Sequence, residues 1–262
     1  CGTAGVGDVS NSLETSDALV AAGMAAVVFH ELIEFRSADA NRIIGESTAR
    51  LQRRPTSPDV QHTLAPHAPY SVSPALFDAI RRYLQDTPLA RSSVHLGESR
   101  AETEFLRSGT GPWRELLEDL GTWDPSWAVP ACSPVDYIDR MGLLDERVLV
   151  VHGVQFGEAE LKRVVQKGVT LVTCPRGNRR TGAGTPPIVE FFESGARVAV
   201  GTDSLASVPD LNVFAELAEM RRVAPDIPAR LLLETATVNG ARALGFERDL
   251  GTIEAGKRDR LI

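Results

Sequence analysis

Seven short apolar runs, separated by amphipathic segments, constrain the fold of this chain more than any other feature. They are "GTAGVGDV" (2–9), "AAVVFHELI" (25–33), "VQHTLAPH" (60–67), "SSVHLGES" (92–99), "RVLVVHGV" (147–154), "GVTLVTCP" (168–175) and "ARVAVGTDS" (196–204). Little alternation of polar and apolar residues within such runs is typical of parallel strands buried on both faces. Segments 73–85, 158–168 and 185–195 between them have helical patterns. The sequence therefore predicts an α/β protein built from repeated βα units.

Two observations favour a (β/α)8 TIM barrel over an open, doubly wound sheet. No G-x-G-x-x-G or G-x-x-x-x-G-K-[ST] phosphate loop follows any run. Polar side chains instead collect where the runs end, as they do at the C-terminal rim of a barrel; they are Glu31, His67, His95, Glu98, His152, Asn178 and Asp203. The 262 residues suffice for one large core. Seven strands are one short of closure, so we expect the first strand before residue 1.

The composition limits which classes of binding partner and which cellular compartment we expect for this protein. The net charge of −7 and the pI near 5.3 argue against nucleic acid or an anionic membrane as a partner. No apolar run approaches the roughly 20 residues that span a bilayer, and no signal peptide is visible. Three widely spaced cysteines fit a reducing compartment. We therefore expect a cytoplasmic protein that binds a small molecule, and the sequence leaves homo-oligomer formation open.

His95, His152 and Asp203 each end an apolar run. In a barrel these ends converge, which favours a metal or proton-transfer site, although a single strand-end histidine is usually structural. Zn²⁺ takes imidazole nitrogen and carboxylate oxygen and keeps one position open for water in catalytic sites. Glu98, three residues after His95, could reach over such a water, or it could be a solvated residue of the acidic stretch "ESRAETE".

Other candidates carry weaker signals. His67, in "APHAPYSVSP", is either a substrate contact or part of a packed turn, and the sequence does not decide between them. Cys174 lies within a run and is expected to be a core thiol. The long segment 100–146, with Trp113 among its three tryptophans, is expected to form an elaborated loop over the mouth of the site.

An ordered series of motifs resembles the metal-dependent amidohydrolase superfamily. These motifs are "HAPYSVSP", "VHLGES", "VVHGV", "TCPRGNRRTGAGTPPI", "VAVGTDS" and "ATVNGARALGFERDLGTIEAGKRDRLI". The series is most similar to deaminases of aminopurine compounds, namely methylthioadenosine/adenosylhomocysteine deaminases and aminofutalosine deaminase-like hydrolases. The likeness runs through nearly the whole chain, and its order is more specific than any single motif.

The resemblance implies roles for individual residues. The histidine of H-x-x-E implies that His95 binds one divalent metal ion, Zn²⁺ with Fe²⁺ as the alternative, and the glutamate implies that Glu98 carries a proton. The aspartate of G-T-D-S implies that Asp203 binds the metal and acts as a base. The histidine of H-G implies that His152 orients water or substrate. His67, Arg176 and Asn178 fall at expected substrate contacts.

The chain departs from the family pattern in two ways. The family carries an H-x-H pair on its first barrel strand, and no H-x-H occurs here, since residues 2–9 resemble the second strand. The family also has a small flanking β domain, and the two segments that would form it are missing here. We therefore expect residues 1–250 to form strands 2 to 8 of the hydrolase barrel and residues 251–262 to begin the return to that domain. In addition, the family's P-R-S-N reads Pro-Arg-Gly-Asn at 175–178. We expect the chain to be part of a larger protein.

The expected reaction is hydrolytic deamination of an amino-substituted purine or nucleoside-like molecule, with release of ammonia. Water activated by a metal ion and deprotonated by Asp203 would attack the amino-bearing ring carbon, while Glu98 protonates the ring nitrogen. The alternatives are hydrolysis of a cyclic amide or a chloro-substituted ring on the same site, and a degenerate barrel without catalysis.

Overall fold

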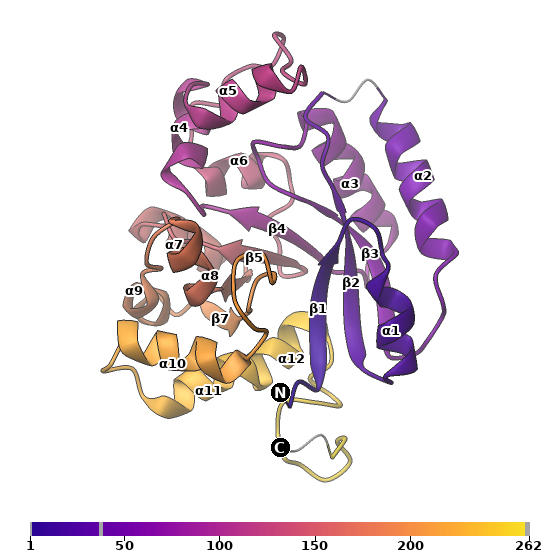
Figure 1. Cartoon of the computed structure of the whole chain (residues 1–262), viewed down its shortest axis with the longest axis vertical. Helices are drawn as coiled ribbons and strands as arrows, with labels where there is room; N and C mark the ends of the chain where they lie inside the picture. Colours follow the sequence, from indigo (N-terminus) through magenta and orange to yellow (C-terminus); the bar gives the residue numbers. More distant parts are fainter. Residues whose placement is uncertain (1, 37–38, 260–262) are drawn as a thin grey trace.

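Seven parallel strands form the centre of the molecule in a computed structural model that describes residues 2–36 and 39–259 (Figure 1). The strands are β1 (Gly5–Ser10), β2 (Ala25–Leu32), β3 (Val60–Pro66), β4 (Ser92–Leu96), β5 (Val148–His152), β6 (Thr170–Thr173) and β7 (Arg197–Val200). Every pairing between neighbours is parallel, in the orders β1-β2-β3 and β4-β5-β6-β7. All seven predicted strands are present, and the α/β prediction is confirmed.

The two sheets continue into one another between β3 and β4. The Ser92 hydroxyl donates to the Leu64 carbonyl at 2.9 Å, and the His95 amide donates to the His67 carbonyl at 2.8 Å. Among the described residues, no strand pairs with the outer edge of β1 or of β7, as expected for a TIM barrel that lacks its first strand. Helix α12 (Val238–Leu244) contacts both of these edge strands and lies near them in Figure 1.

Helices follow most of the strands and cover the outside of the row. They are α1 (Thr15–Ala21), α2 (Ala40–Gln52), α3 (Pro74–Asp86), α4 (Arg100–Ser108), α5 (Pro112–Asp119), α6 (Pro134–Arg140), α7 (Glu158–Gln166), α8 (Pro175–Thr181), α9 (Ile188–Glu193), α10 (Val213–Val223) and α11 (Ala229–Ala236), besides α12. Local sequence explains the start of α3, where the Ser73 side chain accepts from the Leu76 amide and proline occupies the first turn.

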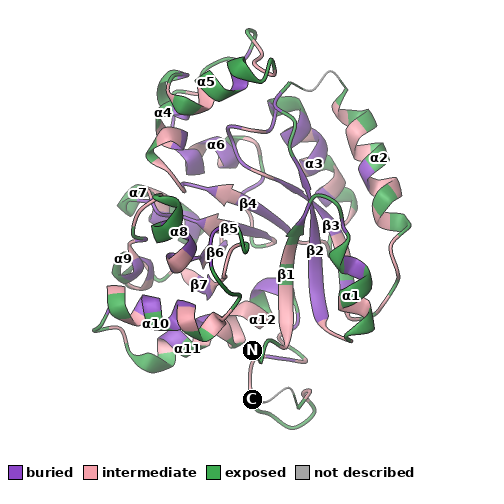
Figure 2. Cartoon of the chain, in the orientation of Figure 1, coloured by how far each residue is buried: buried purple, intermediate pink, exposed green. Residues whose placement is uncertain are grey.

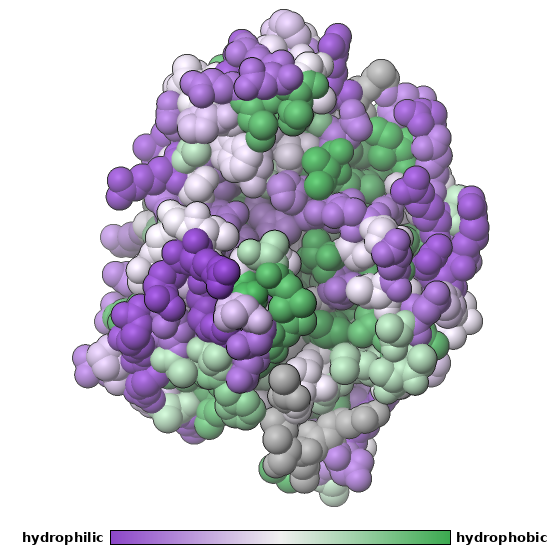
Figure 3. All heavy atoms as spheres, in the orientation of Figure 1, coloured by the Kyte–Doolittle hydropathy of each residue, from purple (hydrophilic) through white to green (hydrophobic). Residues whose placement is uncertain are grey.

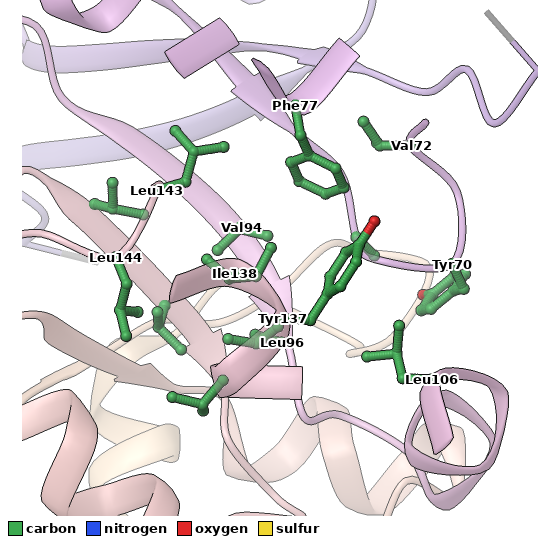
Figure 4. Close-up of a cluster of buried hydrophobic side chains, with 14 of the residues drawn as sticks. Tyr70, Val72, Phe77, Val94, Leu96, Leu106, Tyr137, Ile138, Leu143 and Leu144 are labelled. Carbon is green, nitrogen blue, oxygen red and sulfur yellow. The ribbon is translucent and has the colours of Figure 1, made fainter. Parts of the chain in front are cut away.

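The largest core cluster lies between the strands and this helical layer. Figure 2 shows the strands mostly buried and the outer helix faces exposed. In Figure 4, Val94 and Leu96 of β4 lie in this cluster together with Phe77 of α3 and Ile138 of α6. Because side chains alternate across a strand, His95 between them points to the opposite face, the interior of the row of strands. Packing of the helices therefore orients His95 toward the site.

The segment 100–146 contains three short helices, α4, α5 and α6, where a single elaborated loop was expected. Trp123 and Trp127 pack against Phe35, with ring centroids 5.6 and 5.7 Å apart, and so form part of the core periphery. Trp113 stacks on Tyr70, in the segment that follows β3, with ring centroids 3.8 Å apart. The cover over the mouth of the site that was expected of this segment stays a prediction.

The distribution of polar and apolar residues on the surface follows the arrangement of outer helices around central strands. Figure 3 shows polar residues over the outer helices of this face and apolar residues nearer its centre. No helix in the described part of the chain has the length and apolar character needed to cross a membrane. Residues 251–259 contain neither helix nor strand, so the start of a small β domain at 251–262 stays a prediction.

Replacement of Leu84 by alanine tests the core, because its side chain is 2% exposed within the largest cluster. We expect the free energy of unfolding to fall by about 2–5 kcal/mol, from lost transfer energy and the cavity left behind. Leu89, which is 92% exposed, supplies the matched control, and Leu89→Ala should change stability by less than about 0.5 kcal/mol. Urea denaturation of both variants makes the comparison, and equal losses would contradict the assigned core.

Candidate active site

Three histidines from neighbouring strands lie side by side at the C-terminal ends of β3, β4 and β5. The ring centroids of His67 and His95 are 5.1 Å apart, and those of His95 and His152 are 5.4 Å apart. Parallel pairing produces this row, because it brings the carboxyl ends of successive strands to one edge. The structure therefore brings together three of the residues proposed from the sequence.

Glu31 at the end of β2 joins this row. Suitable ligand atoms of Glu31, His67 and His95 all lie within 4.8 Å of one another. Asn11 donates to Glu31 Oε2 at 3.0 Å, while Oε1 lies 3.3 Å from His95 Nδ1. No role was assigned to Glu31 from the sequence, although its place at a strand end was the available signal. Asp203 is not part of this group of three.

The donor set fits a borderline-soft divalent cation such as Zn²⁺, which accepts imidazole nitrogen and carboxylate oxygen. His95 Nδ1 also lies 3.1 Å from the His67 carbonyl. With Nδ1 as the proton-bearing nitrogen, the carbonyl and the Glu31 carboxylate hold the ring, and Nε2 is left for a metal ion. Such hydrogen bonds to the second nitrogen are characteristic of metal-ligating histidines.

Glu98 and His152 form the second half of the site. Glu98 Oε2 lies 3.8 Å from His152 Nε2, and the Glu98 side chain is 23% exposed. Burial raises the pKa of Glu98, with the His95 charge acting against this rise and the Asp203 charge acting with it. A raised pKa makes a carboxyl group at such a position a better proton donor than an ordinary surface glutamate.

His152 is buried and neutral. Burial, reinforced by the neighbouring His95, lowers its pKa to about 3. Asn178 Nδ2 lies 2.9 Å from His152 Nδ1 and donates to it, so the proton of the neutral ring is on Nε2, the nitrogen nearer Glu98. Asn178 thus holds the His152 ring, and the substrate contact expected for Asn178 stays a prediction.

Asp203 follows β7 in a left-handed backbone conformation, with φ of 62°. Its Oδ1 accepts from the Ser204 amide at 2.7 Å. A Cβ at Gly177 would lie only 3.0 Å from Asp203 Oδ2, so glycine at this position leaves room for the carboxylate. The change from the family's serine to Gly177 therefore bears directly on where Asp203 lies.

The Arg176 guanidinium is engaged by carboxylates. Its Nη1 donates to Asp210 Oδ1 at 2.9 Å and lies 3.6 Å from Glu216 Oε1. These partners raise the pKa of Arg176. The substrate contact expected for Arg176 stays a prediction.

An apolar cavity of about 290 Å³ adjoins His67. The stacked pair of Tyr70 and Trp113 forms one part of its wall. The other lining residues are Ile33, Glu34, Phe35, Ser71, Leu116, Leu117, Leu120 and Thr122. No arginine or lysine occurs among the lining residues, so the cavity favours an uncharged group.

Cys174 has the surroundings expected for a core thiol. It is 2% exposed, and burial raises the pKa of its thiol, which keeps it protonated and unreactive.

Residues 8–262 match the sequence pattern of the amidohydrolase family. The chain belongs to this family. Its relatives include the aminodeoxyfutalosine deaminase of Deinococcus radiodurans, 32% identical over 93% of this chain and 60% of the relative. They also include the 5-methylthioadenosine/S-adenosylhomocysteine deaminase of Moorella thermoacetica, 30% identical over 94% of this chain and 54% of the relative.

Solved structures show the same likeness. The aminofutalosine deaminase of Helicobacter pylori, in complex with methylthio-coformycin, superposes with a TM-score of 0.83 at 27% identity, over 98% of this chain and 62% of that one. A zinc-bound adenosine deaminase from Xanthomonas campestris gives a TM-score of 0.75 at 28% identity, over 93% and 53% of the two chains. The chain thus spans about half to three fifths of the length of these relatives.

Glu216, which holds Arg176, gives the site a measurable pH dependence. Its side chain is fully buried, and burial raises its pKa from 4.5 to about 7 despite the nearby Arg176. Between these values the folded state binds more protons than the unfolded state, so stability should fall as pH rises from about 4.5 to about 7. Glu216→Gln should remove this contribution, whose slope is at most about 1.4 kcal/mol per pH unit.

Unfolding in urea at a series of pH values makes this measurement. Glu219 on the same helix is the matched control, because its bond to Arg222 lowers its pKa. Glu219→Gln should leave the slope between pH 5 and 7 unchanged. An unaltered slope in Glu216→Gln would contradict the assignment to Glu216.

Proposed function

We propose that the protein containing this chain is a metal-dependent hydrolytic deaminase of an amino-substituted purine or nucleoside-like molecule. The observation that carries the proposal is the pair of a half-buried carboxyl, Glu98, and a neutral His152, held 3.8 Å apart beside His95. This arrangement suits proton delivery next to a metal-ligating imidazole. The names of the relatives, which are deaminases of adenosine-type compounds, support the same reaction.

His95 and Asp203 are the proposed ligands for one divalent ion, Zn²⁺ with Fe²⁺ as the alternative. Glu31 and His67 lie close enough to His95 to complete or support the ligand set. When bound, the ion would supply a water molecule whose pKa falls from about 15.7 towards about 7. The zinc in the adenosine deaminase from Xanthomonas campestris supports this choice of metal.

The chain's own residues account for the proton movements. The Asp203 carboxylate takes a proton from the attacking water. The Glu98 carboxyl gives its proton to the ring nitrogen and regains one from the new hydroxyl group as the carbonyl forms. Asp203 passes the proton that it took from water to the amino group, which leaves as ammonia. His152 Nε2–H, directed by Asn178, donates toward the reacting oxygen or toward Glu98. Proton transfers of this kind each contribute about 10²–10⁴ to rate.

The substituent of the substrate fits the cavity beside His67. Its aromatic and aliphatic walls favour an uncharged, apolar group joined to the ring or sugar, and Glu34 disfavours an anionic one. Buried, unpaired Cys132 and Cys174 support the expectation of a reducing, cytoplasmic setting. We retain the expectation of a small-molecule substrate without nucleic acid or membrane as a partner.

Glu98→Gln tests the proton carrier in the complete protein. Glutamine keeps the size of the side chain but cannot transfer the proton, so ammonia release from adenosine-type compounds should fall by about 10²-fold or more. Metal content should not change, because Glu98 is not a proposed ligand. Loss of the metal in this variant would contradict the role of Glu98.

The same assay separates the proposed reaction from its alternatives. Wild-type protein is given adenosine-type compounds, a cyclic amide and a chloro-substituted ring, while ammonia, ring opening and chloride are measured. Ammonia release alone supports deamination. Turnover of another class with no ammonia, or the absence of a stoichiometric metal, would overturn the proposal in favour of another hydrolysis or a non-catalytic barrel.

Trp113→Ala tests the cavity. Removal of the ring that stacks on Tyr70 should raise KM about tenfold for a nucleoside with an apolar 5′ substituent. Adenosine, which lacks the substituent, is the matched control and should keep its KM within about twofold. An equal rise for both compounds would contradict the assignment of the cavity to the substituent.

A further inference from the structure

The turn that carries Glu98 is held by a second, fully buried carboxyl group. Glu102 is 1% exposed, and its two oxygens accept from two successive backbone amides. Oε1 accepts from the Gly97 amide and Oε2 from the Glu98 amide, each at 3.0 Å. Both donors stabilise the ionised carboxylate and oppose burial, which raises the pKa of Glu102 to about 8.

This contact differs from ordinary helix capping. Glu102 occupies the third position of α4, and the Ser99 hydroxyl accepts from its amide at 3.2 Å, as in half of a capping box. In a complete box, the glutamate would reach back to the amide of Ser99 itself. Glu102 instead bonds the amides of Gly97 and Glu98, beyond the helix and in the turn that carries the reactive carboxyl.

The loop after β5 holds the opposite side of the same turn. The Gln155 amide donates to the Gly97 carbonyl at 2.8 Å, and Gln155 Nε2 lies 3.4 Å from the Glu98 carbonyl. Gly97 has φ of +62°, and a Cβ there would overlap the Phe156 ring. The amides and carbonyls of Gly97 and Glu98 therefore all have partners, which restrain the conformation of the turn.

The Glu98 carboxylate itself receives no hydrogen bond from any described side chain, and its nearest basic atom is His152 Nε2 at 3.8 Å. Its position is therefore set by the backbone of the turn. Removal of the Glu102 carboxylate would leave two buried amides without partners, and the turn would have to move to reach other acceptors or water.

We propose that Glu102 is a positioning residue that holds the Gly97–Glu98 turn so that the Glu98 carboxyl meets the reacting nitrogen beside His152. The proposal rests on the proposed function for the reaction and on the hydrogen bonds above for the geometry. Glu102 is 1% exposed and is not one of the proposed metal ligands. Its effect is on the rate of proton delivery, since a displacement of about 1 Å in a reacting group can lower a rate by about 10².

The test compares Glu102→Gln, Glu102→Ala and Glu104→Gln in the complete protein. Glu104 lies on the same helix and is exposed, so it is the matched control. For ammonia release, we expect kcat to fall about tenfold in Glu102→Gln, which keeps one acceptor, and about 10²-fold in Glu102→Ala. KM and metal content should stay within about twofold of wild type, and Glu104→Gln should match wild type in every measurement.

A kcat within twofold of wild type in Glu102→Gln and in folded Glu102→Ala would overturn the proposal. A loss of kcat in proportion to lost metal or to lost folded protein would overturn it as well, because it would show a purely structural role. If Glu102→Ala does not fold, Glu102→Gln decides alone.

Crystal structures of wild type and Glu102→Gln separate this proposal from the proposed function. Movement of the Glu98 carboxylate away from His152 supports positioning even if wild type deaminates no adenosine-type compound, a result that would refute only the reaction. An unmoved Glu98 carboxylate would overturn the positioning role whatever the substrate.

Discussion

The alternation of side chains along buried parallel strands is the constraint on which the rest of the structure depends. In β4, Val94 and Leu96 pack against the helical layer, and this packing sends His95 to the interior. A shift of one residue in strand register would place His95 in the apolar core and Leu96 in the site. The parallel pairing of β3, β4 and β5 then places the three histidine rings about 5 Å apart. The site is thus a consequence of how the core packs.

Desolvation shifts the pKa values of the histidines and the glutamate in this row. Burial lowers the pKa of His67 and of His152 to about 3, so these two imidazoles stay neutral, and burial raises the pKa of Glu98. Neutral imidazole is the form that binds a metal ion or offers a single directed N–H. Hydrogen bonds then select the tautomer, through Asn178 at His152 and through the His67 carbonyl at His95. The proposed metal ligand His95 and the neutral His152 beside Glu98 therefore differ in the partners that hold their rings.

Much of this arrangement could be predicted from the sequence, because strand ends and family motifs are local patterns. The seven strands and the convergence of His95 and His152 followed from such patterns, and the structure confirms them. Asp203, which was expected to converge with these histidines, is not part of the group of ligand atoms around His95. The contacts of Glu31 and Glu102 were not predicted, because the sequence does not show that Glu31 meets His95 on another strand or that the Glu102 carboxyl accepts from the amides of Gly97 and Glu98. The three helices of 100–146 were not predicted for a similar reason. Trp123 and Trp127 of this segment pack on Phe35, which is far away in the sequence. The metal ligands, the substrate contact of Arg176 and the domain boundary after residue 250 stay predictions.

The location of a metal ion in the complete protein tests the central claim most directly. Crystals grown with zinc, measured with X-rays above and below the zinc absorption edge, would locate the ion by its anomalous scattering. The account predicts one strong peak at bonding distance from His95 Nε2, with Asp203 among the ligands and the Glu98 carboxyl nearby but not bound. The absence of a peak, or a peak bound to Glu98 without His95, would contradict the assignment of this strand-end row as a metal-dependent deaminase site.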